Sequence, residues 1–348
     1  MPTLAQAARQ AWPGQRIEVD AGNYVADVAV WTHDDIDLRA VGGRVRLLAG
    51  GAAAEGKAIW VVRANRMRVQ GFDFEGCNVP GRNGAGIRFE RGSLLLRDCS
   101  FTLNEMGLLT SNDAEAMLAI ENCEFAYNMR PDGHNHNLYV GAIARLSVTG
   151  SYFHHAHVGH LLKSRAAVNL IFYNRLTDEA GGSASYELEF PNGGVSYVVG
   201  NLIEQGPQTD NPVLILVGAE GYKWPRNEVY VVNNTLVNLL PKGGDFLRVI
   251  PGAQETQALN NLMVGFGVVE RPGPQDFRNN FAAEASDFAN LAAHDVRLSK
   301  NSGLLGRAID AGSANGISLK PAREYAHPRG TRRIGTSKHN PGAMQSVA

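Results

Sequence analysis

The amino-acid sequence predicts an all-β protein, a right-handed parallel β-helix solenoid with a short N-terminal capping helix and an irregular C-terminal cap. Three observations favour this fold: a six-residue phrase that recurs along most of the chain, a second apolar phrase between its copies, and 39 glycines among 348 residues. Recurrence at intervals of about 20 to 50 residues is typical of solenoids, whose repeats stack into one continuous core.

The N-terminal segment is expected to form the capping helix. Pro13-Gly14 would end this helix, and a strand would begin near Ile17. Such a helix would cover the open edge of the first coil, where backbone groups otherwise lack partners. The apolar residues that recur at the spacing of one helical face are Leu4, Ala7, Ala8, Ala11 and Trp12.

The recurring phrase consists of a β-rich run, a corner of small or amide residues, and a final apolar residue. Its copies are separated by 19 to 33 residues, which suits a coil of three short strands with turns of unequal length. Asn and Gly suit the corner because they tolerate the left-handed backbone conformation. The fourth residues of the nine copies are Phe72, Cys99, Cys123, Ser151, Asn174, Asn201, Asn234, Asn261 and Asn280.

The second phrase is a run of apolar or alternating residues, as expected for strands that fill a core on one side. Stacked coils would place these runs in one parallel sheet, about 4.8 Å apart. The runs begin at Gly86, Gly107, Asn137, His160, Tyr186 and Val213.

Composition excludes several classes of protein. The 33 basic residues nearly balance 34 acidic ones, so no basic excess indicates a nucleic-acid ligand. No apolar run is long enough to span a membrane, and we expect no signal peptide in this chain. Cys77, Cys99 and Cys123 form neither an even disulfide framework nor a close-spaced zinc motif, so we expect small buried side chains.

The opening from Leu4 to Tyr24 ends in Pro13-Gly14 and Ala21-Gly-Asn-Tyr24. With the repeats that follow, it resembles the pectate-lyase-like β-helix superfamily, which includes polysaccharide lyases, uronan C5-epimerases and some glycoside hydrolases. We expect one solenoid over residues 1–285, with 286–348 as a cap and tail packed on it. The resemblance implies an acidic polysaccharide or oligosaccharide substrate and a secreted or periplasmic location.

One stretch, Asp132-Gly-His-Asn-His136 followed by His160-Leu-Leu-Lys-Ser-Arg165, resembles a region of the mannuronan C5-epimerases. Those enzymes carry an Asp-Pro-His-Asp motif and a later His-Gly-…-Ser-Arg run. The resemblance implies that His134 or His136 is the base and that Arg165 neutralises the substrate carboxylate. The Asp-Pro-His-Asp motif itself is absent here, and Lys163 has no counterpart in that pattern.

Histidines concentrate in the same region: six of the ten lie within the 27 residues from His134 to His160. Histidine suits proton transfer near neutral pH. With His134, His136 and His160 at the adjacent turns, three successive coils are expected to form one ionisable patch. Strand alternation predicts that their outward side chains are Asn137 and Tyr139, then Lys163 and Arg165, then Glu187 and Glu189.

A uronate lyase needs a cation to neutralise the carboxylate, a base for the adjacent proton and an acid for the leaving oxygen. The candidates are Arg165 or Lys163 for the cation, His136, His134 or Lys163 for the base, and Tyr139 or His160 for the acid. Candidate substrate-binding residues are Asn137, Glu187 and Glu189. No cofactor is expected, because no dense aspartate cluster offers a calcium site and the two cations can replace the metal.

Structural interpretations and other functions stay open at this point. The charged residues can form surface ion pairs, Tyr139 can lie on a solvated face, His134 and His136 can be turn residues, and His160 can point inward. The leading expectation is a polysaccharide lyase that acts by β-elimination. The alternatives are a uronan C5-epimerase, a glycoside hydrolase with a carboxylate pair, a metal site in the histidine cluster, and a non-catalytic polysaccharide-binding solenoid. The hydrolase pair would come from Glu187, Glu189 and Asp210, whereas His154, His155 and His157 are expected to be loop residues.

Overall fold

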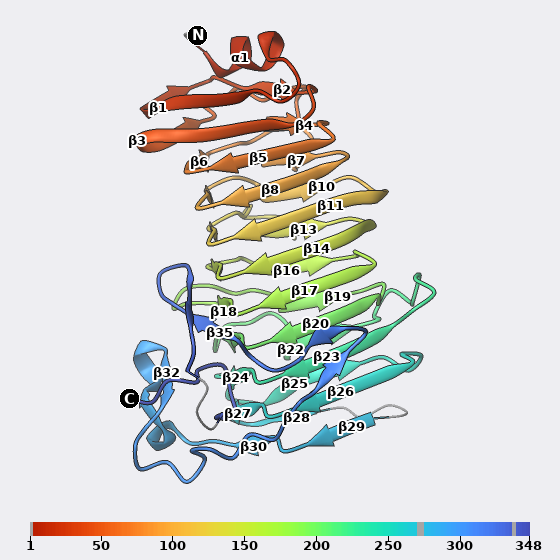
Figure 1. The fold of residues 1–348 in the computed structure, drawn as a ribbon, viewed down its shortest axis with the longest axis vertical. Coiled ribbons are helices and arrows are strands. Elements are labelled where there is room, and N and C mark those ends of the chain that lie inside the picture. The colour runs from red at the N-terminus through yellow and green to blue at the C-terminus, as the bar shows by residue number, and fades with distance from the viewer. Residues whose placement is uncertain (1–2, 270–274, 336–338) are drawn as a thin grey trace.

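The computed structural model describes residues 3–269, 275–335 and 339–348, and it shows an elongated parallel β-helix (Figure 1). Most coils contribute one strand to a sheet of ten strands and two consecutive strands to a larger sheet, to which the first two coils contribute one long strand each. The larger sheet has twenty strands among the described residues. All pairings in both sheets are parallel and join one coil to the next, which confirms the predicted solenoid.

The strands of the ten-stranded sheet are β2 (Ala29–Trp31), β4 (Ala58–Val62), β7 (Ala85–Phe89), β10 (Met106–Thr110), β13 (Leu138–Val140), β16 (His160–Ser164), β19 (Tyr186–Phe190), β22 (Val213–Val217), β25 (Gly244–Val249) and β28 (Gly267–Val269). This sheet contains the second recurring phrase.

In the larger sheet, β1 (Arg16–Val25) and β3 (Ile36–Leu48) run through the corner as single long strands. The later coils have two strands, on either side of the corner that the first phrase predicts. Before the corner lie β5 (Arg66–Gln70), β8 (Ser93–Arg97), β11 (Asp113–Glu121), β14 (Ile143–Thr149), β17 (Val168–Phe172), β20 (Val195–Val199), β23 (Glu228–Val232), β26 (Glu255–Leu259) and β29 (Gln275–Arg278). After the corner lie β6 (Phe72–Glu75), β9 (Ser100–Thr102), β12 (Glu124–Ala126), β15 (Tyr152–His154), β18 (Arg175–Thr177), β21 (Leu202–Gln205), β24 (Thr235–Asn238), β27 (Leu262–Val264) and β30 (Phe281–Ala282).

The capping helix α1 (Leu4–Gln10) lies over the first coil, as predicted (Figure 1). Thr3 is its N-cap, because the hydroxyl of Thr3 accepts a hydrogen bond from the backbone N–H of Gln6 at 3.1 Å. The expected apolar face is buried through Ala11. Trp12 is 60% exposed and does not belong to that face, since the backbone is already extended at Ala11.

Aromatic side chains stack along the core with the spacing of the coils. The rings of Phe74, Phe101, Phe125 and Phe153 follow one another with centroid distances of 4.9, 4.6 and 4.8 Å. Each is the last residue of one copy of the first phrase. The register of the phrase in the sequence is therefore the register of the core, and offset stacks of this kind add to the burial energy.

The corner residues also stack, through hydrogen bonds between successive coils. The amide of Asn201 donates to the carbonyl of Ile171 at 2.8 Å and to Oδ1 of Asn234 at 3.0 Å, and its own Oδ1 accepts from Asn174. The left-handed residue is the third of each phrase, not the fourth: Gly71, Asp98, Asn122, Gly150, Tyr173, Gly200, Asn233, Asn260 and Asn279. The third position therefore makes the bend, and the fourth position satisfies the backbone groups that the bend exposes.

Two expectations from composition can be compared with the structure. The three cysteines are free and buried, as predicted. Among the described residues, the structure contains no helix with the length and apolar content that a membrane span requires.

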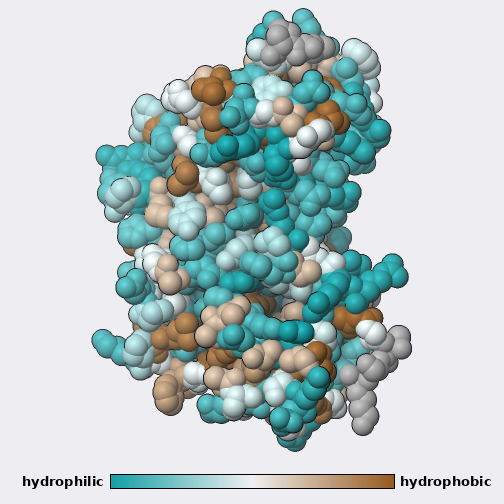
Figure 2. Space-filling model, turned by 90° about the vertical axis from the view of Figure 1, so that its left-hand side faces the viewer, coloured by the Kyte–Doolittle hydropathy of each residue, from teal (hydrophilic) through white to brown (hydrophobic). Residues whose placement is uncertain are grey.

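The chain after β30 turns back along the stack and contacts many coils (Figure 1). Gly342 donates to the carbonyl of Asn260 at 2.7 Å, Ala322 to the hydroxyl of Tyr173 at 3.0 Å, and Gly330 to the carbonyl of Gly150 at 2.6 Å. Hydrophilic side chains predominate on this side of the molecule, and hydrophobic ones are scattered in small groups (Figure 2). The elements of this segment are η1 (Ala285–Asp287), β31 (Phe288–Asn290), η2 (Leu291–Ala293), β32 (Asp295–Leu298), β33 (Ser313–Ala314), β34 (Ile317–Ser318), β35 (Arg323–Tyr325) and β36 (Thr331–Arg333).

Candidate active site

Three of the predicted site residues lie side by side on the outer face of the ten-stranded sheet. Tyr139 in β13 pairs in register with Lys163 in β16, which pairs with Glu189 in β19. Leu162 and Leu188, one position earlier, are fully buried in the core, so the alternation of the strands sends the polar residues outward. The sequence separates these three side chains by dozens of positions, and the stacking of coils brings them together.

The cation cluster consists of Tyr139, Lys163, Arg165, Glu189 and Glu220. Lys163 Nζ lies 2.8 Å from Glu189 Oε2 and 3.0 Å from Glu220 Oε1. The guanidinium of Arg165 donates to both carboxylate oxygens of Glu220, at 2.8 and 2.7 Å, and to the hydroxyl of Tyr139. Two cations and two carboxylates thus alternate over one patch of the sheet.

Glu220 is a member of this cluster that the sequence did not indicate. It lies in the turn between β22 and β23, outside any strand, so its orientation cannot be read from alternation. The only local signal is that glycines with left-handed backbone, Gly218 and Gly221, flank it and mark a tight turn.

Two histidines extend the cluster along the same face. Nε2 of His160 lies 2.9 Å from Oε2 of Glu189, and Nδ1 of His160 lies 2.9 Å from Nδ1 of His136. The backbone N–H of His160 also donates to Nδ1 of His136 at 2.9 Å. Glu189, His160 and His136 therefore form a chain of contacts through which a proton can be shared.

Burial and charge set the protonation of this chain. Burial, followed by the charges of His160 and Lys163, holds the pKa of His136 well below its usual range, so the ring is neutral near pH 7. Burial also lowers the pKa of His160, although Glu189 opposes the shift. Burial alone would raise the pKa of Glu189, but the close contact with His160 and the charge of Lys163 outweigh it and keep the pKa low. Glu189 is therefore an anion in contact with Lys163.

The predicted outward position of Asn137 is wrong. Asn137 is fully buried, where its Oδ1 accepts from the amide of Asn128 at 2.9 Å and its own amide donates to the carbonyl of His154 at 2.9 Å. Asn137 lies one residue before β13, at a corner, where the alternation of the strand does not apply. It holds two coils together and has no access to the outer face.

The predicted outward position of Glu187 is also wrong. Glu187 lies at the register position of Leu161 and Leu214, both fully buried core residues, and is itself fully buried. Neither of its carboxyl oxygens has a hydrogen-bond partner in another described residue. Burial raises the pKa of Glu187 well above its usual range, so the side chain is a neutral acid inside the solenoid.

The cause of this error is an interrupted alternation at the start of each strand. Strict alternation with Glu187 outward would turn Tyr186 inward, but Tyr186 is half-buried and its ring lies 4.9 Å from that of His160 on the outer face. Residues 187 and 188 then both face the core before Glu189 points outward. With Glu187 inside, the carboxylate pair expected for a glycoside hydrolase loses one of its members.

The histidine cluster of the sequence divides into separate groups. His136 and His160 join the cation cluster, whereas His134 is exposed in the preceding turn. His157 contacts the hydroxyl of Ser183 at 2.9 Å. His154 belongs to β15 and points to another face of the solenoid, so the expectation that it is a loop residue is wrong.

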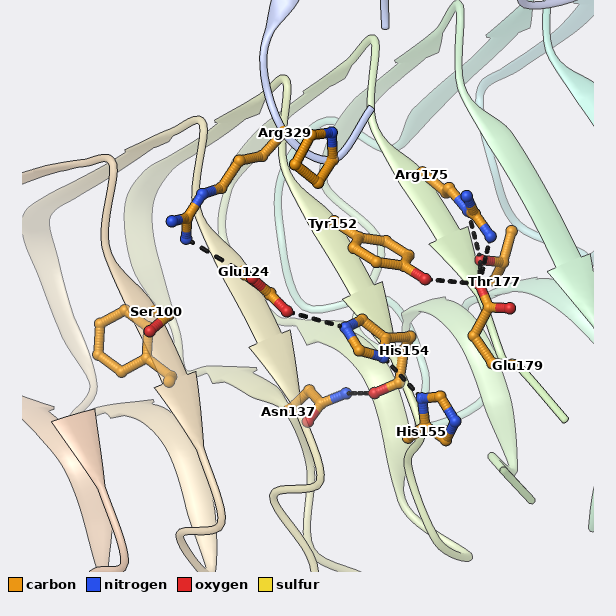
Figure 3. A network of polar contacts seen from close by, with 12 residues as sticks. Ser100, Glu124, Asn137, Tyr152, His154, His155, Arg175, Thr177, Glu179 and Arg329 are labelled. Atoms are coloured by element: carbon orange, nitrogen blue, oxygen red, sulfur yellow. Dashed lines mark hydrogen bonds and ion pairs between the residues drawn. The ribbon is translucent and has the colours of Figure 1, made fainter. Parts of the chain in front are cut away.

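His154 belongs to the tail-docking network, which Figure 3 shows on β12, β15 and β18. This network consists of Glu124, Tyr152, His154, Arg175, Glu179 and Arg329. His154 Nε2 lies 3.2 Å from Glu124 Oε1, and Arg329 reaches in from the C-terminal segment to the second oxygen of Glu124 at 3.6 Å. Its acids already have cationic partners, and it attaches the C-terminal segment to the sheet.

A hollow of about 530 Å³ lies on the same side as the cation cluster. Asp210, Lys242, Asp245 and Arg248 contribute to its lining. Arg248 occupies the same register row as Glu189, two coils further on, so the hollow continues the outer face beyond the cluster. Its size is within the range of small-molecule sites in proteins.

The described residues contain no group of three or more His, Cys, Asp or Glu side chains arranged to hold a metal ion. In the cation cluster, ammonium and guanidinium groups occupy the positions next to the carboxylates. These cations can neutralise a ligand carboxylate themselves.

Comparison with known proteins supports the fold. No family model matches the chain, and no curated protein matches its sequence. Among solved structures, the crystal structure of pectate lyase Pel9A is similar, with a TM-score of 0.66 and 14% identity over 98% of this chain and 90% of that chain. The protein therefore has the pectate-lyase-like fold of right-handed parallel β-helices.

Proposed function

We propose that this protein is a polysaccharide lyase that cleaves a uronate-containing polymer by β-elimination. The observation that carries the proposal is the contact of Tyr139, Lys163, Arg165 and Glu189 across three coils of one sheet face. The pectate lyase of the structural comparison shares the fold, and its printed name gives the reaction class that we extend to this chain.

The two cations supply the first requirement of the reaction. A uronate carboxylate that contacts the Arg165 fork and the Lys163 ammonium would lose much of its charge, which acidifies the adjacent C5–H bond. Arg165 can bind both carboxylate oxygens, as it does in its contact with Glu220. Glu189 lies under Lys163 and fixes the position of the ammonium group.

His136 and Tyr139 supply the proton transfers in this mechanism. One of them takes the C5 proton, the electron pair of that bond forms the C4–C5 double bond, and the C4–O bond breaks. The other gives a proton to the departing oxygen. The backbone N–H of His160 donates to Nδ1 of His136, so the neutral ring carries its proton on Nε2. His136 is then the acid that protonates the departing oxygen, and Tyr139 takes the C5 proton.

Incubation with a panel of uronans tests the proposal. We expect the wild-type protein to release products with unsaturated ends, detected by ultraviolet absorbance and mass spectrometry. The variant Arg165→Gln should release no such products. Inversion at C5 without chain scission, seen by proton NMR, would identify an epimerase instead. New reducing ends without unsaturation would identify a hydrolase, and binding without any product would identify a non-catalytic solenoid.

A further inference from the structure

The cation cluster has no net charge to offer a carboxylate ligand. Lys163 and Arg165 carry two positive charges, and Glu189 and Glu220 carry two negative ones. The hydrogen bonds of Arg165 and Lys163 outweigh burial and keep the pKa of Glu220 below its usual range, so this acid is ionised near neutral pH. A uronate can therefore contact both cations only if one of the two acids leaves.

Glu189 is fixed in the sheet and does not fit this role. Its side chain is only 4% exposed, it belongs to β19, and both His160 and Lys163 hold it. Removal of this carboxylate from its position would leave the buried Nε2 of His160 without a partner, which is costly.

Glu220 is the acid that can leave. Its side chain is 43% exposed, and its carboxylate contacts only Lys163 and Arg165 among the described residues. Lys163 and Arg165 are largely buried, so the exposure lies on the Glu220 side of these pairs, where water can solvate the carboxylate once it moves away.

The backbone that carries Glu220 is well anchored, so only the side chain has to move. The indole of Trp224 donates to the carbonyl of Arg165 at 3.0 Å, and the backbone N–H of Lys223 donates to the carbonyl of Asn192 at 3.0 Å. Gly218 has a φ of +84°, and a Cβ there would lie 2.7 Å from the ring of Tyr222. The turn is therefore tight, and a change of rotamer at Glu220 uncovers the cations without a loop movement.

We propose that Glu220 is a built-in competitor for the substrate: its carboxylate occupies the place of a uronate carboxylate and is displaced when the polymer binds. This inference rests on the proposed function, because it takes Lys163 and Arg165 as the carboxylate site. It predicts a site that selects polymers. A single uronate must displace Glu220 with one set of contacts, whereas a polymer adds contacts elsewhere on the outer face, for example in the hollow beside Lys242.

Binding of monomeric uronates tests the competitor. Glucuronate, galacturonate and mannuronate would be titrated by NMR or calorimetry into wild type, Glu220→Gln and Glu220→Ala, with glucose as the uncharged control. We expect both variants to bind at least one uronate about three- to tenfold more tightly than wild type, the range expected when an exposed ionic competitor is removed. Arg165→Gln should abolish this binding and so place it at the cluster.

Glu121→Gln is the matched control. Glu121 forms an exposed ion pair with Arg97 at 2.6 Å, on the larger sheet, and its removal should leave uronate affinity unchanged. The contrary result is unchanged or weaker uronate binding in both Glu220 variants, with thermal unfolding equal to wild type. It would show that Glu220 only positions the cations, and it would overturn the proposal that Glu220 competes with the substrate.

The two proposals can fail separately. Tighter binding in the Glu220 variants without unsaturated products from any uronan would retain the competitor and reject the lyase. Lyase products from wild type with no gain of affinity in the variants would reject the competitor alone. Absence of uronate binding in wild type and in both variants at millimolar concentrations would overturn the carboxylate site and the competitor with it.

Discussion

The guanidinium of Arg165 lies over the ring of Tyr139, 5.0 Å from its centroid, and also donates a hydrogen bond to the hydroxyl of the same residue. The cation–π contact places the guanidinium over the ring, and the hydrogen bond fixes the direction of one of its N–H groups. The hydroxyl oxygen accepts from Arg165, so the proton of Tyr139 is directed elsewhere. This pair therefore places a cation and an ionisable hydroxyl next to each other on the sheet face.

Tyr139→Phe should separate the two functions of this pair. The variant keeps the ring under Arg165 but loses the hydroxyl, so we expect kcat to fall by about 10² to 10⁴ while KM changes little. Steady-state kinetics on the uronan that wild type cleaves would measure this. Tyr24→Phe, which removes the hydroxyl that donates to the carbonyl of Asp20 in β1, is the control and should keep full activity. Equal losses in both variants would argue against a role of Tyr139 in proton transfer.

Arg165→Lys should show that the shape of the cation matters as well as its charge. Lysine keeps the positive charge, but its single ammonium group cannot contact the Tyr139 hydroxyl and a carboxylate from two separate nitrogens, as Arg165 does, so we expect kcat/KM to fall by about ten- to a hundredfold. The substitution Arg97→Lys changes a similar exposed ion pair on the other sheet and should leave kcat/KM unchanged. Wild-type kinetics in Arg165→Lys would mean that only the charge is needed.

The pH dependence of the lyase should reflect the low pKa of His136. A ring with a pKa well below 6.5 stays neutral as the pH falls through 6.5, so kcat/KM should hold there and decline only at lower pH. In Glu189→Gln, His160 loses its anionic partner, so the pH profile should shift and the maximal rate should fall. A pH profile that is the same in wild type and Glu189→Gln would show that the Glu189–His160–His136 chain does not take part.

Stacking could be predicted from the sequence because the recurring phrase fixes the core register. The copies that end in Phe101, Phe125 and Phe153 mark the positions whose rings stack. Once the coils are aligned, the outward neighbours in mid-strand follow, so Tyr139, Lys163 and Glu189 could be placed together. Alternation is a property of extended backbone and holds only inside a strand.

The positions at strand ends and in turns could not be predicted in this way. Asn137 and Glu187 lie where the chain enters a strand from a corner, and there two successive residues can face the same side. Glu220 lies in a turn whose path depends on tertiary contacts such as that of Trp224 with Arg165. The same limit explains the histidines, because a concentration in the sequence does not specify which face of a coil each one reaches.

Glu187→Gln should change how stability depends on pH. The folded-state pKa of Glu187 is raised, so folding favours the protonated form, and this stability is lost as the pH rises above about 4.3 towards the folded-state pKa. The glutamine does not titrate. We therefore expect wild type and variant to be similarly stable near pH 4 and the variant to become the more stable as the pH rises.

Thermal unfolding of both proteins would measure this difference over the range from about pH 4, near the ordinary pKa of a glutamate, to about pH 8. Asp178, whose pKa burial raises to about 6, titrates in both proteins, and its charge is a second cause of the raised pKa of Glu187. Parallel stability curves would mean that Glu187 is solvated or paired in the folded protein.

Asn201→Ala should destabilise the solenoid through its corner. The substitution removes the acceptor of the backbone N–H of Asn174 and the donor to the carbonyl of Ile171, both buried. Unsatisfied buried groups of this kind cost about 1–3 kcal/mol each, so we expect a loss of roughly 2–4 kcal/mol in the free energy of unfolding. Chemical denaturation would measure it, with the exposed Asn23→Ala as the control. A loss below 0.5 kcal/mol, about the size of a surface substitution, would contradict the structural role of the stack.

The returning C-terminal segment has a mechanical consequence. Solenoids whose units touch only their neighbours can peel open one unit at a time from either end. Here the C-terminal segment is hydrogen-bonded to the coils of Asn260, Tyr173 and Gly150. Unfolding that starts at the last coil must therefore also break these lateral contacts. A force applied to the C-terminus would act first on these lateral contacts, and the coils that they join should then unfold together and not one by one.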